Sequence, residues 1–238
     1  MSGHSKWAQI KHKKAATDAK KGKLFSQLSR AITLAAKTGG PDPDMNAALR
    51  LAIEKARQAN VPASNIEKAI KRAVEKDAAA LTKVRYEAYG PGGVALLIEG
   101  ITDNTNRMLN EVKRILQKHG GKLAEPGAVG WMFAKKAVFA VPAESVADKD
   151  ALLLELIDEG AEEINEDGDV LRVVAASDAA ERVRAALKRA YGLDIAASPE
   201  WISATTVALS PRDQQSMLQL YEELGEHEDV TEVSSNER

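Results

Sequence analysis

The feature that most constrains the fold of this chain is an alternation of short strands and amphipathic helices that begins near residue 84. Strands are expected at 84–89 and 94–101, joined by a tight turn at Gly90-Pro91-Gly92-Gly93. A helix follows Asp103, and the alternation continues with strands at 137–141, 161–165, 170–175, 202–209 and 230–233 and helices at 148–159, 177–191 and from Pro211. This order is typical of split βαβ units, in which helices cover one face of an antiparallel sheet. We therefore predict an α+β body with room for two such units.

The chain before this body has a helical pattern. Apolar residues at helical spacing predict one helix from Leu24 to a stop at Gly39-Gly40-Pro41, and a second over residues 46–60. A third helix is expected to open with a capping box at Ser64-Asn65-Ile66-Glu67 and to end near Val74. These three short helices predict a compact helical head, and the weakly periodic residues 75–83 predict a domain boundary near residue 80.

Charge is divided unevenly between the two parts. The chain has a net charge of −2, but residues 1–80 carry +9 and the remainder carries −11. Seven lysines stand against one acid, Asp18, between Gly3 and Lys23. A basic head on an acidic body indicates an anionic partner for the head. Because the early lysines are not followed by an apolar run and spread around the helical wheel, a signal peptide and a membrane-surface helix are both disfavoured.

Nucleic acid is the polyanion that this pattern favours, with the contacts made to the phosphate backbone. Lysines position a protein on phosphates without reading sequence, which favours structured RNA or weakly specific DNA. Trp7 has two alternative roles, stacking on an exposed base or packing on the helical head to pin the basic arm. The predicted nucleic-acid contacts are Lys6, Trp7, Lys11, His12, Lys13, Lys14, Lys20, Lys21, Lys23, Arg30, Lys68, Lys71 and Arg72. The polar run that opens the helix after Asp103 predicts a second contact surface at Asn104, Asn106 and Arg107.

Catalysis and metal binding have little support in the sequence. There is no cysteine, and the four histidines, at positions 4, 12, 119 and 227, have no paired ligand spacing. No nucleophile elbow or kinase-like motif is present, and the glycines at 90–93 precede a strand and lack the lysine of a phosphate-binding loop. We therefore predict a non-enzymatic protein with no metal, cofactor, small-molecule substrate or membrane partner.

Three segments carry a resemblance to a known family. GHSKWAQIKHKKAATDAKKGKLF, RLAIEKARQANVPASNIEKAIKRA and RYEAYGPGGVALLIEGITDNTNR resemble the YebC/PmpR family, and GKLAEPGAVGWMF also fits it. The mitochondrial relative of that family is the translational activator of cytochrome c oxidase. The resemblance covers nearly the whole chain, and because the family pattern starts directly after Met1 it implies a bacterial-type, cytoplasmic member.

The resemblance also implies a fold and two alternative functions. It implies a helical head at 1–80 and two ferredoxin-like α+β domains, of which one, at 135–204, is inserted into the other, at 81–134 and 205–238. It implies a DNA-binding transcriptional regulator, or alternatively a ribosome-associated translation factor that binds rRNA or tRNA and relieves stalling at proline-rich sequences. The residues themselves do not choose between these alternatives.

Overall fold

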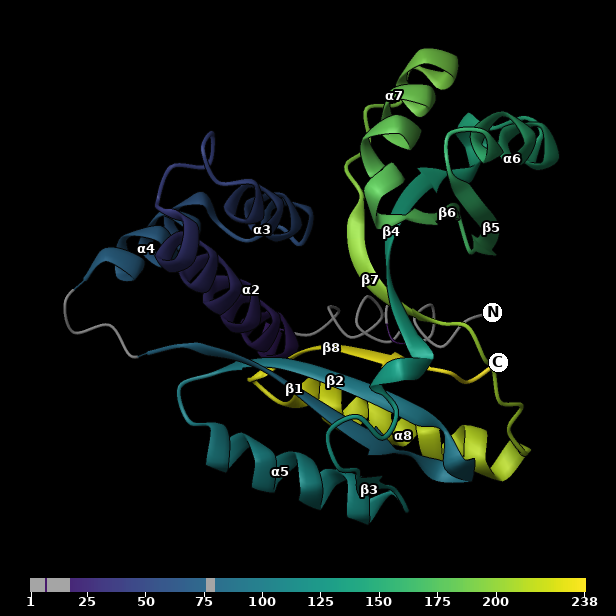
Figure 1. Ribbon diagram of the computed structural model, residues 1–238. Coiled ribbons are helices and arrows are strands. Elements are labelled where there is room, and N and C mark those ends of the chain that lie inside the picture. Colours follow the sequence, from purple (N-terminus) through teal and green to yellow (C-terminus); the bar gives the residue numbers. More distant parts are fainter. Residues whose placement is uncertain (1–6, 8–17, 76–79) are drawn as a thin grey trace. The chain divides into compact units, whose positions relative to one another are not determined.

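The computed structural model describes Trp7, residues 18–75 and residues 80–238 (Figure 1). For residues 18–20 it describes the backbone alone. Within these ranges the chain forms two compact units. One unit combines the described parts of 7–129 with 209–233, and the other combines 130–208 with 234–238.

The helical head belongs to the first unit and consists of α2 (Asp18–Gly39), α3 (Ala47–Gln58) and α4 (Ala63–Val74). All three predicted helices are present. Their apolar faces meet in one buried cluster made mainly of Ile32, Ala36, Leu49, Ile53, Ala56, Val61, Ile66 and Ala69. The predicted capping box is wrong, because α4 already begins at Ala63, after Pro62, and has no side-chain cap. Proline pre-sets the backbone angle for a helix start, so Ser64 lies inside the first turn.

The first sheet has the strand order β3-β1-β2-β8, from β1 (Thr82–Tyr89), β2 (Ala95–Thr102), β3 (Lys122–Leu123) and β8 (Val230–Ser235). β1 and β2 are antiparallel, paired from Thr82↔Thr102 to Tyr89↔Ala95, and a short 3-10 turn at Pro91–Gly93 joins them as predicted. β3 pairs antiparallel with the other edge of β1. Since β2 and β3 therefore run in the same direction, with α5 (Thr105–Lys118) between them in the chain, they form a split βαβ unit.

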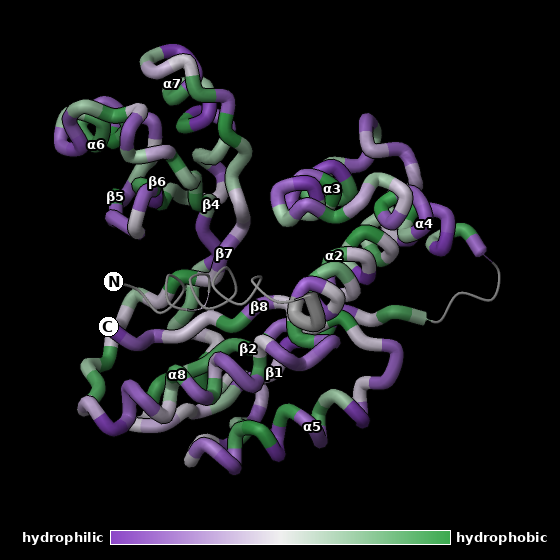
Figure 2. The backbone as a smooth tube through the Cα atoms, turned by 180° about the vertical axis from the view of Figure 1, so that it is seen from behind, coloured by the Kyte–Doolittle hydropathy of each residue, from purple (hydrophilic) through white to green (hydrophobic). Residues whose placement is uncertain are grey.

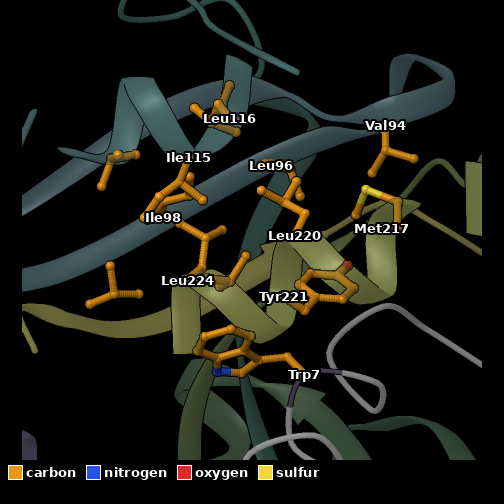
Figure 3. Close-up of a cluster of buried hydrophobic side chains, with 14 of the residues drawn as sticks. Trp7, Val94, Leu96, Ile98, Ile115, Leu116, Met217, Leu220, Tyr221 and Leu224 are labelled. Carbon is orange, nitrogen blue, oxygen red and sulfur yellow. The ribbon is translucent and has the colours of Figure 1, made fainter. Parts of the chain in front are cut away.

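The core of this α+β layer lies between the sheet and the helices α5 and α8 (Pro211–Glu226). Figure 2 shows hydrophilic and hydrophobic residues alternating along α5, as expected of an amphipathic helix. Figure 3 shows buried side chains of this core, among them Leu96 and Ile98 of β2, Ile115 and Leu116 of α5, Leu220 and Tyr221 of α8, and Trp7. Ser210 caps α8 and Pro211 is its first residue, so the helix start predicted there is confirmed.

The second unit contains β4 (Phe133–Pro142), α6 (Lys149–Ile157), β5 (Ala161–Asp167), β6 (Val170–Ala176), α7 (Ala180–Tyr191) and β7 (Ser198–Ser203). Its sheet has the order β5-β6-β4-β7, and the strand pairs β4–β6, β4–β7 and β5–β6 are all antiparallel. This is the ferredoxin-like βαββαβ arrangement. Leu152, Leu156, Val183 and Leu187 of the two helices pack on Phe139 and Val173 of the sheet.

The last strand of this sheet was predicted at the wrong place. β7 occupies 198–203, where it pairs with β4, whereas the apolar residues just after it leave the sheet. Val207 instead forms an isolated parallel bridge with Glu237. The strand was predicted at 202–209 because that segment is the more apolar of the two. Pairing with β4 instead makes residues 198–203 the strand.

The predicted α+β class, with a three-helix head followed by two α+β sheets, is confirmed. The finer division at residues 80, 134 and 205 stays a prediction, because the contacts group the head with the first sheet in one unit. None of the helices in the described ranges is both long and apolar enough to cross a membrane.

Candidate nucleic-acid interface

Most of the predicted basic arm lies outside the described residues. This applies to Lys6, Lys11, His12, Lys13 and Lys14, and also to the side chain of Lys20. Lys21 and Lys23 are exposed in the first turns of α2, which begins at Asp18 rather than at Leu24. Contact between these lysines and nucleic acid stays a prediction.

Trp7 is buried in the first α+β core. Its side chain is 2% exposed and lies edge-on to Tyr221 of α8, with ring centroids 6.0 Å apart and planes at 62°. Of the two predicted roles, packing is therefore the one observed, but Trp7 packs on the α+β layer and not on the helical head (Figure 3). In this position the indole is not accessible to a base, so the stacking role does not hold for the structure described.

Three predicted contact residues of the head converge on one crevice. Arg30 of α2 and Lys68 and Arg72 of α4 line a cavity of about 340 Å³. Lys68 and Arg72 are four residues apart, so they lie on one face of α4. The hydroxyl of Thr33 on α2 donates to the carbonyl oxygen of Ala69 on α4 at 2.9 Å and holds the two helices in register. Lys71, also predicted, is exposed on α4 but does not line the crevice.

The remaining lining of the crevice is polar on one side and mixed on the other. Ser26, Ser29 and Asn65 add hydroxyl and amide groups from the head. Leu81 and Asp103, from the α+β layer of the same unit, add an apolar contact and a carboxylate. Three cations against one carboxylate make the site electropositive, and the hydroxyl and amide groups add hydrogen-bond donors that suit a phosphate.

The additional lining residues were not among the predicted contacts, although the sequence carries a signal for them. On α2 the lining residues are Ser26, Ser29, Arg30 and Thr33, and on α4 they are Asn65, Lys68, Ala69 and Arg72. Both sets have the spacing i, i+3, i+4, i+7, which is one face of a helix. Two polar stripes with the same spacing on neighbouring helices would have indicated a shared polar surface.

Arg30 is oriented by a buried carboxylate. Its guanidinium donates to Asp229, which is 2% exposed, and its other terminal nitrogen lies 3.4 Å from Glu228. The second carboxylate oxygen of Asp229 accepts from the Thr102 hydroxyl and from the Arg107 guanidinium, both at 2.9 Å. Asp229 therefore fixes one cation of the crevice in place, which limits the side-chain entropy that Arg30 would lose on binding an anion.

Two residues of the second predicted contact surface have structural roles. Asn104 is the N-cap of α5, and its side-chain oxygen accepts from the Arg107 backbone amide at 3.0 Å. The Arg107 guanidinium bridges Asp103 at 2.8 Å and Asp229. Asn106 is exposed on the same helix. Contact of this surface with nucleic acid stays a prediction.

Two of the histidines have carboxylate partners. His119 Nε2 lies 2.7 Å from Glu223, and His227 Nε2 lies 2.8 Å from Glu111. Burial lowers the pKa of His227, against the opposing effect of Glu111. No group of three or more metal-ligating side chains occurs in the described parts of the chain.

Known proteins resemble this chain over nearly its whole length. A family model described as the TACO1/YebC protein N-terminal domain matches residues 5–76, and one described as the TACO1/YebC second and third domain matches residues 81–237. A "Probable transcriptional regulatory protein" from Dictyoglomus turgidum is 46% identical over 237 residues, which cover 99% of this chain and 95% of that protein. A protein of the same name from Carboxydothermus hydrogenoformans is 41% identical over 239 residues, covering 99% and 98%.

A solved structure has the same fold. The crystal structure of a conserved hypothetical protein from Aquifex aeolicus superposes with a TM-score of 0.85 at 40% sequence identity, covering 98% of this chain and 96% of that chain.

Proposed function

We propose a function for this chain from one premise: the chain belongs to the TACO1/YebC family. The proposal is a non-enzymatic regulator of gene expression that binds nucleic acid through its basic head, with the cytoplasm as its predicted compartment. The names of the relatives, which call them probable transcriptional regulatory proteins, support the regulatory part of this proposal. The nucleic-acid part is supported by the charge of the head.

The observation that carries the proposal is the convergence of Arg30, Lys68 and Arg72 on one crevice of the head. An anion bound in the crevice interacts favourably with Lys68 and Arg72, whereas the charge of Arg30 is partly balanced by Asp229. Most of the crevice lining comes from residues 1–80, which carry a net charge of +9, while the rest of the chain carries −11. A polyanion is therefore attracted to the head and repelled by the body, which sets its approach direction.

Contacts of this kind predict a marked salt dependence and little sequence specificity. Each phosphate neutralised releases counterions, so the logarithm of affinity falls with the logarithm of salt by about 0.9 per duplex phosphate and about 0.7 per single-strand phosphate. Guanidinium and ammonium groups on phosphates position the protein without reading bases.

The proposal is tested by nucleic-acid binding of the full chain and a double variant, Lys68→Glu/Arg72→Glu. We expect this variant to bind more weakly at low salt and to show a smaller salt slope. Lys55→Glu/Arg57→Glu on α3 is the matched control, because both residues are exposed and neither lines the crevice. Equal binding by the wild type and the crevice variant, or no binding of any DNA or RNA by the wild type, would overturn the proposal.

Sedimentation of lysate through a sucrose gradient separates the transcriptional role from the ribosomal alternative. A protein absent from ribosomal fractions, together with a footprint on promoter DNA, would support the transcriptional role. Salt-sensitive migration with ribosomes would instead favour the translation factor.

A further inference from the structure

The two sides of the crevice differ in charge and polarity, and this difference indicates which kind of ligand the crevice binds. Arg30, Lys68 and Arg72 come from α2 and α4 of the head, whereas Leu81 directly precedes β1 and Asp103 directly follows β2. A uniform phosphate channel would have cations throughout. Here a carboxylate and an apolar side chain complete the site, and a carboxylate disfavours a second phosphate beside it.

We propose that the crevice holds a single unpaired nucleotide of a nucleic-acid strand, with its phosphate on the head cations and its base toward Leu81 and Asp103. This proposal rests on the proposed function and specifies the ligand of the same site. A cavity of about 340 Å³ is at the lower end of the range for small-ligand pockets, roughly 300–1,000 Å³, which suits one nucleotide. In a duplex the bases are stacked and paired, so only an unpaired nucleotide can turn its base into such a site.

The chemistry of Asp103 defines the preferred base. An ionised carboxylate only accepts hydrogen bonds, so it pairs with exocyclic amino groups such as N4 of cytosine. Uracil carries a carbonyl oxygen at that position, which a carboxylate repels. Asp103 is held at the crevice by Arg107, whose guanidinium donates to it at 2.8 Å. The nearby Asn65 has both a donor and an acceptor, so it adds no discrimination of its own.

The test measures fluorescence anisotropy of the full chain with oligocytidine, oligouridine and a duplex of equal length at one salt concentration. We expect the single strands to bind more tightly than the duplex, and oligocytidine more tightly than oligouridine by about threefold to tenfold, the effect of one partly exposed charge-assisted hydrogen bond. Asp103→Asn should remove the difference between the two single strands.

Two alanine variants on one helix supply the matched control. Arg72→Ala should remove the preference for single strands over the duplex, whereas Lys71→Ala, the neighbouring cation outside the crevice, should preserve it even if overall affinity falls. Both side chains are exposed, so neither change is expected to unfold the head, which circular dichroism checks.

The outcomes separate the two proposals. If the wild type binds none of the three ligands, the proposed function fails. If it binds but the duplex is bound as tightly as the single strands, or Arg72→Ala and Lys71→Ala behave alike, only the nucleotide crevice is overturned. Equal affinity for oligocytidine and oligouridine in the wild type overturns the position of the base beside Asp103.

Discussion

At the scale of single residues, burial decides the roles of Trp7 and His227. Trp7 is an isolated aromatic in a basic segment, yet its ring is enclosed by the α+β core beside Tyr221 and Gly225. His227 is one of four scattered histidines, yet its Nδ1 accepts from the Asp229 backbone amide at 3.1 Å and its Nε2 faces Glu111. Trp7 thereby stabilises the fold, and His227 makes the stability depend on pH.

Replacing Trp7 by alanine is expected to destabilise the first unit. Removal of a buried tryptophan leaves a cavity and costs about 3–5 kcal/mol of unfolding free energy. Urea unfolding followed by circular dichroism measures the loss. Trp131→Ala is the control, because that side chain is 72% exposed and surface changes usually stay within about 0.5 kcal/mol. Similar midpoints for the two variants would contradict the buried position of Trp7.

His227 is expected to make stability depend on pH below its ordinary pKa of 6.5. Burial lowers the pKa of His227 in the folded protein, with smaller lowering effects from Arg107 and Arg30 and an opposing effect from Glu111. The unfolded chain therefore binds a proton first as pH falls. The contribution of His227 to stability is complete above pH 6.5 and declines as pH falls toward its folded pKa.

The measurement is the unfolding free energy between about pH 5 and pH 8. His227→Gln should flatten the decline on the acidic side. An unchanged slope in His227→Gln would show that another group carries the pH dependence.

At the scale of elements, α2 is attached to the turn between α8 and β8. The Gln27 side-chain amide donates to the His227 carbonyl oxygen at 2.9 Å, and Arg30 binds Asp229 two residues further on. The Asp229 backbone oxygen also accepts from Ile101 in the first sheet at 2.8 Å. One turn thus joins the head helix, the sheet and the start of α5 through Arg107.

Asp229→Ala is expected to weaken this attachment strongly. It leaves Arg30, Arg107 and the Thr102 hydroxyl without their shared acceptor, and removing one member of a buried ion pair costs on the order of 3 kcal/mol. Urea unfolding measures the loss, and increased trypsin cleavage near α2 would locate it. Glu228→Ala is the control, because that carboxylate is exposed and its pair with Arg30 is worth about 0.2–1 kcal/mol. Equal effects would show that Asp229 does not hold the head.

At the scale of the whole molecule, the chain forms two units with separate hydrophobic clusters. The sheet of the second unit has its own core under α6 and α7, and the first unit has the core under α5 and α8 together with that of the head. Among the described residues each of these clusters lies within one unit, so each unit has the means to unfold by its own cooperative transition.

Calorimetry of single-core variants tests this independence. Leu224→Ala in the first unit and Leu187→Ala in the second each remove a fully buried side chain, at a cost of about 2–5 kcal/mol. We expect each variant to lower one thermal transition and leave the other near its wild-type temperature. A single transition that shifts equally in both variants would contradict the separation.

Most helices and strands could be predicted from the sequence, because hydrophobic periodicity and turn residues act on neighbouring residues in the chain. Periods of 3.6 and 2 identified the helices and most strands, and Gly90-Pro91-Gly92-Gly93 and Ser210-Pro211 marked a turn and a helix start. The strand at 198–203 was misplaced because hydrogen bonding to β4, and not hydropathy, selects it. The basic head was equally visible, since charge is a property of composition.

The tertiary structure alone decided which of those charges work together and which polar residues are structural. Arg30 and Arg72 are far apart in the chain, and only the packing of α2 against α4 brings them to one crevice. Asn104 and Arg107 looked available for binding, but the helix start and Asp229 engage them. Trp7 had two alternative roles by sequence, stacking or packing, and its ring lies in a core built by residues more than 80 positions away. Contacts between distant segments depend on the whole fold, so local patterns do not contain them.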